Sequence, residues 1–207
     1  YDEMLEMASM GAKVLQIRSV EFAKKYGVPV HVRSTFTDNP GTMVTQEDSM
    51  MEAVLVSGVA YDKDQARVTL EGVPDQPGIS AAIFQPLAAS GIMVDMIIQT
   101  ASRGGVTDMT FTVPRKALAD AIGIMESVLK SVGGARVVSS GNVAKVSVIG
   151  VGMRNHTGVA SKAFAALYRE NINILMISTS EIKISCLIEE KYAELAVRTL
   201  HDAFKLG

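Results

Sequence analysis

"EGVPDQPGISAAIFQPL", residues 71–87, has the pattern of a strand that passes through a loop rich in proline and glycine into a helix. A related pattern returns as "IGVGMRNHTGVASKAFAAL", residues 149–167. The offset is 78 residues before the loop and 80 after it, and the matched pairs are Ala66 with Ala144, Gly72 with Gly150, Gly78 with Gly158, Phe84 with Phe164, Ile92 with Ile172 and Ile97 with Ile177. An internal repeat whose one phase shift falls in a loop indicates two copies of one small domain.

The segments around the two loops predict the order strand-helix-strand-strand-helix-strand. In the first copy the predicted elements are a strand at 66–73, a helix at 79–91, strands at 92–102 and 107–113, a helix at 114–133 and a strand at 135–141. In the second copy they are a strand at 144–152, a helix at 159–171, strands at 172–180 and 181–190 and a helix at 191–207. The second copy lacks a last strand, and we expect a spare strand at 53–61 to complete its sheet. The predicted fold is α+β, with four-stranded antiparallel sheets that each carry two helices on one face.

The first 45 residues stand apart from the repeat. Residues 1–26 predict helix, which Gly27 is placed to end, with an apolar stripe before Gly11 (Met4, Leu5, Ala8) and another after it (Val14, Ile17, Val20, Phe22). Residues 28–36 alternate as a strand, and the turn after them leads into a polar stretch that predicts a linker. We expect no partner strand within this segment, so it predicts the last piece of a larger α/β domain.

The composition is typical of a folded globular protein, with 48% apolar and 20% charged residues among 207. The formal net charge of −2 gives no reason to expect nucleic acid or an anionic membrane as a partner. The single cysteine cannot form an internal disulfide, and the acidic start lacks the pattern of a signal peptide. No apolar run reaches the ~20 residues of a membrane span. We therefore expect a cytoplasmic location.

The first corner (residues 75–80) and the second corner (residues 155–160) each offer the unpaired N–H groups of a helix N-terminus that is entered through a glycine. Such a terminus binds a carboxylate or a phosphate without a basic side chain. In the first corner Asp75 adds a carboxylate suited to an ammonium group, and Asp95 and Gln99 add polar groups nearby. Groups that bind a carboxylate beside a group that binds an ammonium predict a site for a free amino acid.

Simpler structural roles are open for these residues. Both corners have the form of ordinary turns, Asp75 is suited to capping a helix, and His156 is suited to an exposed loop. His31 and His201 lack the spacing of metal ligands, and Cys186 lies in phase with the apolar residues of its strand, which predicts a buried packing role. The sequence shows no Ser/His/Asp or Cys/His arrangement and no phosphate-binding loop, so it predicts no catalytic residue and no metal site.

Taken together, these segments resemble the C-terminal part of aspartokinases, in which an amino-acid-kinase domain is followed by two ACT regulatory domains. The stretches "EMLEMASMGAKVLQIRSVEFAKKYGVPVHVRSTF" (3–36) and "NPGT" (39–42) resemble the end of that kinase domain. The repeat resembles the tandem ACT domains, and "INILMISTSEIKISCLI" (172–188) is its most specific string. The resemblance implies two ferredoxin-like ACT domains, and the implied organisation is a catalytic tail and linker at 1–45, a first ACT domain at 63–140, and a second at 141–207 completed by strand 53–62.

The resemblance implies an enzyme that transfers a phosphoryl group from ATP, with Mg, to the β-carboxylate of L-aspartate. The product, 4-phospho-L-aspartate, begins the synthesis of lysine, threonine and methionine, and often of diaminopimelate, and feedback inhibition by threonine, lysine or both is implied as well. Lys13 and Val14 match the family's "GAKVL" nucleotide-binding segment. The family's Lys-Phe-Gly-Gly motif and its aspartate-binding residues are missing from the sequence, so we expect these 207 residues alone to hold no cofactor and to be catalytically inactive.

The family's effector-binding positions match two groups of residues. In the first copy they are Asp75, Gln76, Pro77, Gly78, Ile79, Ser80, Val94, Asp95 and Gln99. In the second copy they are Asn155, His156, Thr157, Gly158, Val159, Ala160, Asn173, Ile174, Ser178, Thr179, Ser180 and Glu181. The second corner departs from the Asp-x-Pro-Gly form of the first, which leaves open a different way of binding or none. Positions at which family members are often desensitised match Ser102, Thr107 and Thr110.

The resemblance also implies partners. ACT domains associate side by side through their sheets, so a homodimer that covers the edge strands is expected. The kinase domain would come either from the α subunit of an α2β2 assembly, with this chain as β subunit, or from the rest of a longer chain. A regulatory ACT pair of a different metabolic enzyme is the alternative. RNA-recognition modules share the element order, but "ARVTLEGV" and "AKVSVIGV" lack the aromatic residues that base stacking needs.

Overall fold

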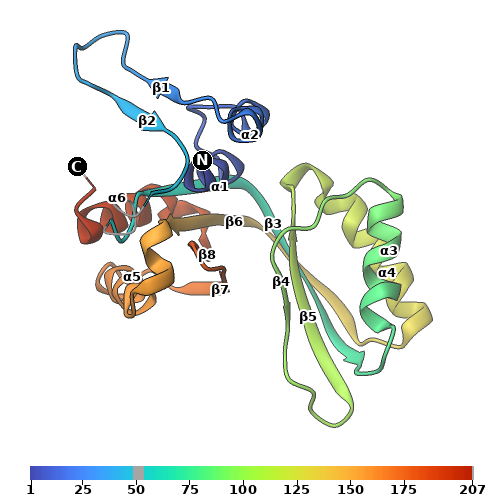
Figure 1. Ribbon diagram of the computed structural model, residues 1–207. Coiled ribbons are helices and arrows are strands. Elements are labelled where there is room, and N and C mark those ends of the chain that lie inside the picture. The colour runs from blue at the N-terminus through green and yellow to red at the C-terminus, as the bar shows by residue number, and fades with distance from the viewer. Residues whose placement is uncertain (49–53, 207) are drawn as a thin grey trace. The chain divides into compact units, whose positions relative to one another are not determined.

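The computed structural model describes residues 1–48 and 54–206 (Figure 1). The chain divides into two compact units. Unit 1 consists of Tyr1–Asp62, Lys145–Cys186 and Tyr192–Gly207, and unit 2 consists of Lys63–Ala144 and Leu187–Lys191. None of the helices in the described part of the chain is long and apolar enough to span a membrane. The domain boundaries given above stay a prediction.

Unit 2 contains the first copy of the repeat. Its elements are β3 (Gly58–Pro74), α3 (Ile79–Ala89), β4 (Ile97–Gln99), β5 (Val106–Val113), the 3-10 helix η2 (Arg115–Ala117), α4 (Leu118–Val132) and β6 (Arg136–Ile149). Strands β3 and β6 also contain residues of unit 1. The strand order is β4-β5-β3-β6, and β5 runs antiparallel to β4 and to β3. Gly133, with φ 87°, ends α4 as predicted.

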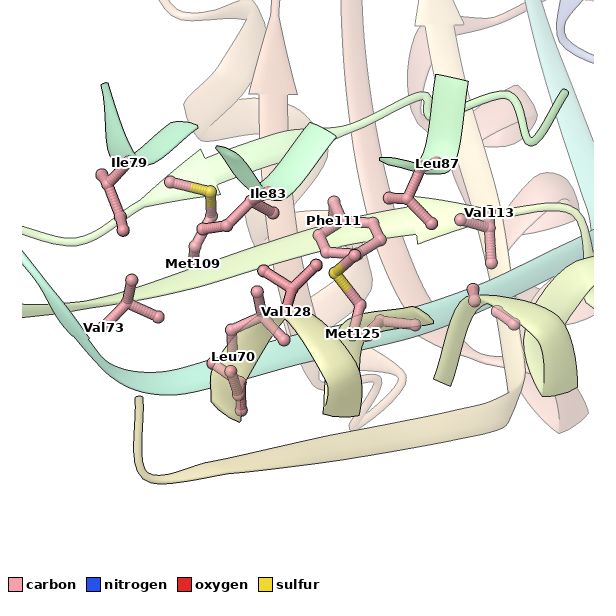
Figure 2. Close-up of a cluster of buried hydrophobic side chains, with 14 residues drawn as sticks. Leu70, Val73, Ile79, Ile83, Leu87, Met109, Phe111, Val113, Met125 and Val128 are labelled. Carbon is pink, nitrogen blue, oxygen red and sulfur yellow. The ribbon is translucent and has the colours of Figure 1, made fainter. Parts of the chain in front are cut away.

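Alternation along the central strands places apolar side chains on one face of this sheet. Leu70 of β3 lies opposite Met109 of β5, and Val68 lies opposite Phe111. Figure 2 shows how side chains of α3 and α4 pack on these residues. The buried core of unit 2 comprises Ala66, Val68, Leu70, Val73, Ile79, Ile83, Leu87, Met109, Phe111, Val113, Ala121, Met125, Val128 and Leu129.

Unit 1 contains the front segment and most of the second copy of the repeat. Its elements are α1 (Asp2–Ser9), α2 (Ile17–Tyr26), β1 (Val30–Val32), β2 (Thr42–Val44), the 3-10 helix η3 (Val151–Asn155), α5 (Val159–Arg169), β7 (Ile174–Thr179) and α6 (Ala193–Phe204). Two elements, β8 (Lys183–Glu189) and the 3-10 helix η4 (Glu190–Tyr192), contain residues of both units. The strand order here is β3-β6-β8-β7. The predicted α+β fold with antiparallel sheets is confirmed.

Two pairs of predicted strands are continuous in the structure. The strands predicted at 53–61 and 66–73 lie largely in β3, and those predicted at 135–141 and 144–152 lie largely in β6, which ends at Ile149. The predicted breaks at 62–65 and 142–143 were wrong, because the backbone stays in the strand through both stretches, and Gly141 does not have a positive φ. Residue 53 lies outside the described residues, and residues 54–57 precede β3.

The edge strand β4 is shorter than predicted. The sequence predicts a strand over 92–102, whereas the structure has a regular strand only over Ile97–Gln99. The N–H of Met96 donates to the side-chain Oγ1 of Thr112 at 3.2 Å. The hydroxyl thus takes the place of a backbone acceptor, and the regular ladder begins only at the next residue.

The front segment contains two helices and a pair of strands of its own. Residues 10–16 separate α1 from α2, and α2 ends at Gly27 (φ 64°) as predicted. Strand β1 pairs antiparallel with β2, with Val30 opposite Val44, so the expectation of no partner strand within this segment was wrong. Val44 favours the pairing because it is buried in a small core with Tyr1, Val20 and Ala23.

Only part of the second apolar stripe in the front segment is buried. Val20 is completely buried and Ala23 lies one helical turn further on, whereas Val14, Ile17 and Phe22 are exposed. Helix α2 starts at Ile17, so Val14 lies outside it. Phe22 is two residues from Val20, which places it on the opposite side of the helix.

Candidate functional site

The first corner is an open helix N-terminus. Gly78 is the N-cap of α3 with φ 89°, and no side chain caps the helix there. The first helical hydrogen bond runs from the N–H of Ala82 to the carbonyl oxygen of Gly78 at 3.0 Å. Ile79 is buried and anchors the helix start, while the loop residues 75–78 and Ser80 are exposed. The first amide groups of α3 therefore lie where an anionic group could reach them.

The predicted polar residues of the first copy lie in two segments, and the structure does not bring Asp95 to the helix start, because Asp95 bonds to Thr112, which pairs with Arg67, eight residues before Asp75. The Asp75 carboxylate is exposed, and its backbone N–H donates to the carbonyl oxygen of Gly105 at 2.9 Å. Asp95 is held through its backbone N–H, which donates to the carbonyl oxygen of Thr112 at 3.0 Å, and Val94 packs against the core. Gln99 is the exposed last residue of β4, opposite Met109. The predicted residues of the first copy thus fall into one group at the loop and the start of α3, and a second group before and within β4.

The second corner repeats the backbone of the first one. Gly158 is the N-cap of α5 with φ 90°, no side chain caps it, and Val159 is buried like Ile79. Helices α3 and α5 have 11 residues each and start 80 residues apart, as the sequence repeat predicts. Thr157 and Gly158 are exposed, and Ala160 is half-buried. Both copies therefore build the same helix start.

The approach to the second corner differs from the first. Residues 151–155 form η3, in which Val151 and Gly152 are buried, whereas the sequence predicts the end of a strand at 151–152 and a loop from 153. The Nδ1 of exposed His156 lies 2.8 Å from the carbonyl oxygen of Gly152. Arg154, which the sequence analysis did not single out, lies 3.0 Å from the Glu47 carboxylate and 3.6 Å from that of Glu181. The only signal in the sequence was a basic residue beside the loop.

The remaining predicted residues of the second copy lie along β7 and the turn after it. Asn173 precedes the strand and is exposed, Ile174 and Ser178 are half-buried, and Thr179 is its last residue. The Ser180 N–H donates to the carbonyl oxygen of Lys183 at 2.8 Å, which forms the turn into β8.

A hydroxyl cluster lies at the end of the β4–β5 hairpin. The Thr107 side chain is buried, and its Oγ1 donates to the carbonyl oxygen of Thr100 at 2.7 Å. The Oγ1 atoms of Thr110 and Thr69 lie 3.0 Å apart across the two central strands, while Ser102 is exposed. A cavity of about 390 Å³ beside this cluster is lined by Thr100, Ala101, Arg103, Val106, Thr107 and Asp108.

Lys13 and Val14 lie in the connection between α1 and α2, and both side chains are exposed. Among the described residues, no group of three or more His, Cys, Asp and Glu side chains could hold a metal ion. The nucleotide contact of Lys13 and Val14 stays a prediction.

Cys186 is expected to be unreactive in the folded protein. It is buried, as predicted, and burial raises the pKa of its thiol from 9.0 to about 12. The thiolate is the reactive form, so labelling by a disulfide reagent at pH 8 should be at least about 100-fold slower than in urea. Fast labelling of the folded protein would contradict this.

The same pKa fixes a pH dependence of stability. Because the folded-state pKa is raised, the contribution of the neutral thiol is fully present below about pH 9 and is lost as the pH rises toward about 12. We expect the difference in free energy of unfolding between the wild type and Cys186→Val to shift against the wild type between pH 8 and pH 11. An unchanged difference would contradict the raised pKa.

A model of the ACT domain family matches residues 68–129 and 146–204. These two ranges contain the two corners and the helices that follow them. The chain therefore belongs to the ACT domain family.

Known relatives narrow this assignment. The chain is 52% identical over 207 residues to aspartate kinase Ask_LysC of Stutzerimonas stutzeri, a match of 100% of this chain and 50% of that protein. It is 45% identical to the ligand-free regulatory subunit of aspartate kinase from Thermus thermophilus, with a TM-score of 0.69 over 72% of this chain and 99% of that one. E. coli aspartokinase III in complex with lysine and aspartate (T-state) is 29% identical, with a TM-score of 0.71 over 98% of this chain and 44% of that one. The chain is the ACT-bearing regulatory region of an aspartokinase, and it spans about half the length of the first of these relatives.

Proposed function

We propose that this chain binds a free amino acid, threonine or lysine, and reports its abundance to an aspartokinase catalytic domain. The observation that carries the proposal is the first corner, where the exposed Asp75 lies three residues before Gly78, the uncapped start of α3. The helix start suits the α-carboxylate of the ligand, and Asp75 suits its α-ammonium group. The lysine complex of the E. coli relative supports an amino acid as the ligand class.

The other predicted positions extend this site. Gln76, Pro77, Gly78, Ile79 and Ser80 would surround the ligand carboxylate, Gln99 would contribute from the end of β4, and Val94 and Asp95 from the residues before that strand. The second-copy residues would form a second half-site in the same manner. Arg154 lies beside that half-site and pairs with Glu181, so a ligand there would meet a different charge pattern.

We further propose a homodimer through the sheet edges. Strands β4 and β7 end the two strand orders, and each exposes an isoleucine at the same position of the repeat. Ile97 is 52% exposed and Ile177 is 41% exposed. Burial of such edges against a second copy would remove unpaired backbone groups and apolar surface from water.

The activity of the whole protein follows as part of the proposal. ATP and Mg would bind in the catalytic domain or α subunit, where aspartate would be phosphorylated on its β-carboxylate in the cytoplasm. Lys13 and Val14 would add a contact to the nucleotide from this chain. The 207 residues alone would be catalytically inactive and would act through coupling, for which ~1–3 kcal/mol suffices.

Calorimetric titration of the folded protein with L-threonine and L-lysine, singly and together, tests the proposal. We expect binding heat with at least one of them. N-acetyl-L-threonine lacks the ammonium group and L-threonine amide lacks the carboxylate, so each should bind at least about tenfold more weakly than threonine if threonine is the ligand. The corresponding lysine derivatives serve if lysine binds. No heat from either amino acid would overturn the proposal.

A further inference from the structure

The strand that leads into the first corner contains a β-bulge. Leu70 lies opposite Met109, but the next pair is Val73 opposite Thr107. Glu71 and Gly72 on β3 therefore face the single residue Asp108 on β5. Beyond the bulge the ladder resumes, and the Asp75 N–H still donates to the carbonyl oxygen of Gly105. The bulge thus sets which way the chain faces as it enters the corner.

Gly72 gives the bulge its shape. Its φ of 66° lies in the left-handed region, and a Cβ added there would stand 3.1 Å from the Cβ of Ala135. The carbonyl oxygen of Glu71 accepts the N–H of Ala135 at 2.8 Å. The bulge also turns the Gly72 N–H out of the regular ladder, so this donor needs another acceptor.

Asp108 supplies that acceptor. Its carboxylate Oδ1 accepts the N–H of Gly72 at 2.9 Å. The backbone of Asp108 is held separately, since its N–H donates to Thr100 Oγ1 at 3.1 Å and its carbonyl oxygen accepts the N–H of Thr100 at 3.0 Å. The carboxylate can therefore be removed without taking away the bonds that keep β5 in its ladder.

In the second copy of the repeat, the N–H of the corresponding glycine has a backbone acceptor. Gly150 is the counterpart of Gly72, and its φ of 178° is extended. Its N–H donates to a backbone carbonyl oxygen, that of Ile182, at 3.0 Å. A side-chain carboxylate takes this role in the first copy, which is the copy whose corner carries Asp75.

We propose that Asp108 is a positioning residue for the amino-acid site: by accepting the Gly72 N–H it holds the bulge that aims residues 75–78 at the ligand. The inference rests on the proposed function of the first corner. A slip of the bulge by one residue would reverse the side-chain direction of the residues that follow it, Asp75 included.

The test compares three variants in the full 207-residue chain. Asp108→Ala removes the acceptor, Asp108→Asn keeps an acceptor oxygen without the charge, and Glu71→Gln removes a charge from the same bulge while leaving the Gly72 bond. We expect Asp108→Ala to weaken binding of L-threonine or L-lysine, whichever the wild type binds, at least about tenfold. Asp108→Asn and Glu71→Gln should bind within about threefold of the wild type.

A measurement without ligand separates this inference from the proposed function. Hydrogen exchange of the Gly72 amide should be about tenfold faster or more in Asp108→Ala, and unchanged in Asp108→Asn. No heat from wild-type protein overturns the proposed function and, with it, the ligand role of Asp108. If the wild type binds, a folded Asp108→Asn that loses binding tenfold overturns the inference, as does Asp108→Ala with wild-type affinity. Should Asp108→Ala not fold, Asp108→Leu provides the acceptor-free variant and the Asn variant still decides.

Discussion

Replacing Asp75 by alanine is expected to weaken binding of the amino-acid effector by about 30-fold or more. The Asp75 carboxylate is exposed beside the open start of α3, and in the proposed site it accepts hydrogen bonds from the ligand ammonium group. Loss of a charge-assisted hydrogen bond costs about 2 kcal/mol, which corresponds to this factor. Calorimetric titration with L-threonine and L-lysine measures it.

Two further variants sharpen this experiment. Asp75→Asn keeps the hydrogen-bonding shape without the charge, so its loss should be smaller, about tenfold. Asp120→Ala removes an exposed carboxylate from α4 in the same unit and should leave the affinity unchanged. If the Asp75→Ala variant binds the amino acid as tightly as the Asp120→Ala variant does, Asp75 does not bind the ligand ammonium group.

The second large effect concerns the core of unit 2. Replacing Phe111 by alanine is expected to lower the free energy of unfolding of this unit by about 3–5 kcal/mol. Phe111 is completely buried, and its ring contacts that of Phe84 edge to face at a centroid distance of 5.3 Å. The deletion would leave a cavity between β5 and α3, as Figure 2 indicates from the side chains around the ring. Urea unfolding followed by circular dichroism measures the change.

An exposed phenylalanine provides the control. Phe36 is 93% exposed, so Phe36→Ala should change stability by less than about 0.5 kcal/mol. Phe111→Leu keeps most of the volume and should cost about 1–1.5 kcal/mol, which gives a measurable value even if the alanine variant does not fold. Equal effects of Phe111→Ala and Phe36→Ala would show that the core lies elsewhere.

Much of the fold could be predicted because several independent signals agree. The apolar pattern and the placement of glycines predict the starts of α3 and α5. The offset of 80 residues in the sequence repeat also separates the N-caps of these helices, Gly78 and Gly158. Gly27 and Gly133 end their helices as glycines in the left-handed conformation. Cys186 is buried as predicted, although its phase is not the reason, because β8 is buried on both faces from Ile184 to Ile188.

Other features depend on contacts that a local pattern does not contain. The continuity of β3 through the polar residues between Tyr61 and Ala66 is decided by pairing across the sheet, since nothing in that stretch forbids a turn. The pairing of β2 with β1 depends on Val44 reaching a core formed with Tyr1 and Val20.

At the candidate site, the sequence predicts the two corners but not the residues that contact them from distant parts of the chain. Asp75 and Gly78 stand in a recognisable strand-loop-helix pattern. Asp108 lies 33 residues beyond Asp75, and Arg154 meets Glu47 from 107 residues away, so only the folded chain brings them into reach. The effector positions themselves stay a prediction that the titrations address.

The division of the chain between its units has a consequence for biosynthesis. Unit 1 takes residues 1–62 from an early part of the chain and 145–186 and 192–207 from a late part, whereas most of unit 2 is the continuous stretch 63–144. During synthesis on the ribosome, residues 1–62 cannot complete unit 1 until its late segments emerge, so unit 2 can fold first. Nascent chains just long enough for residue 144 to have left the ribosome should therefore show unit 2 resistant to protease before unit 1 gains any such resistance.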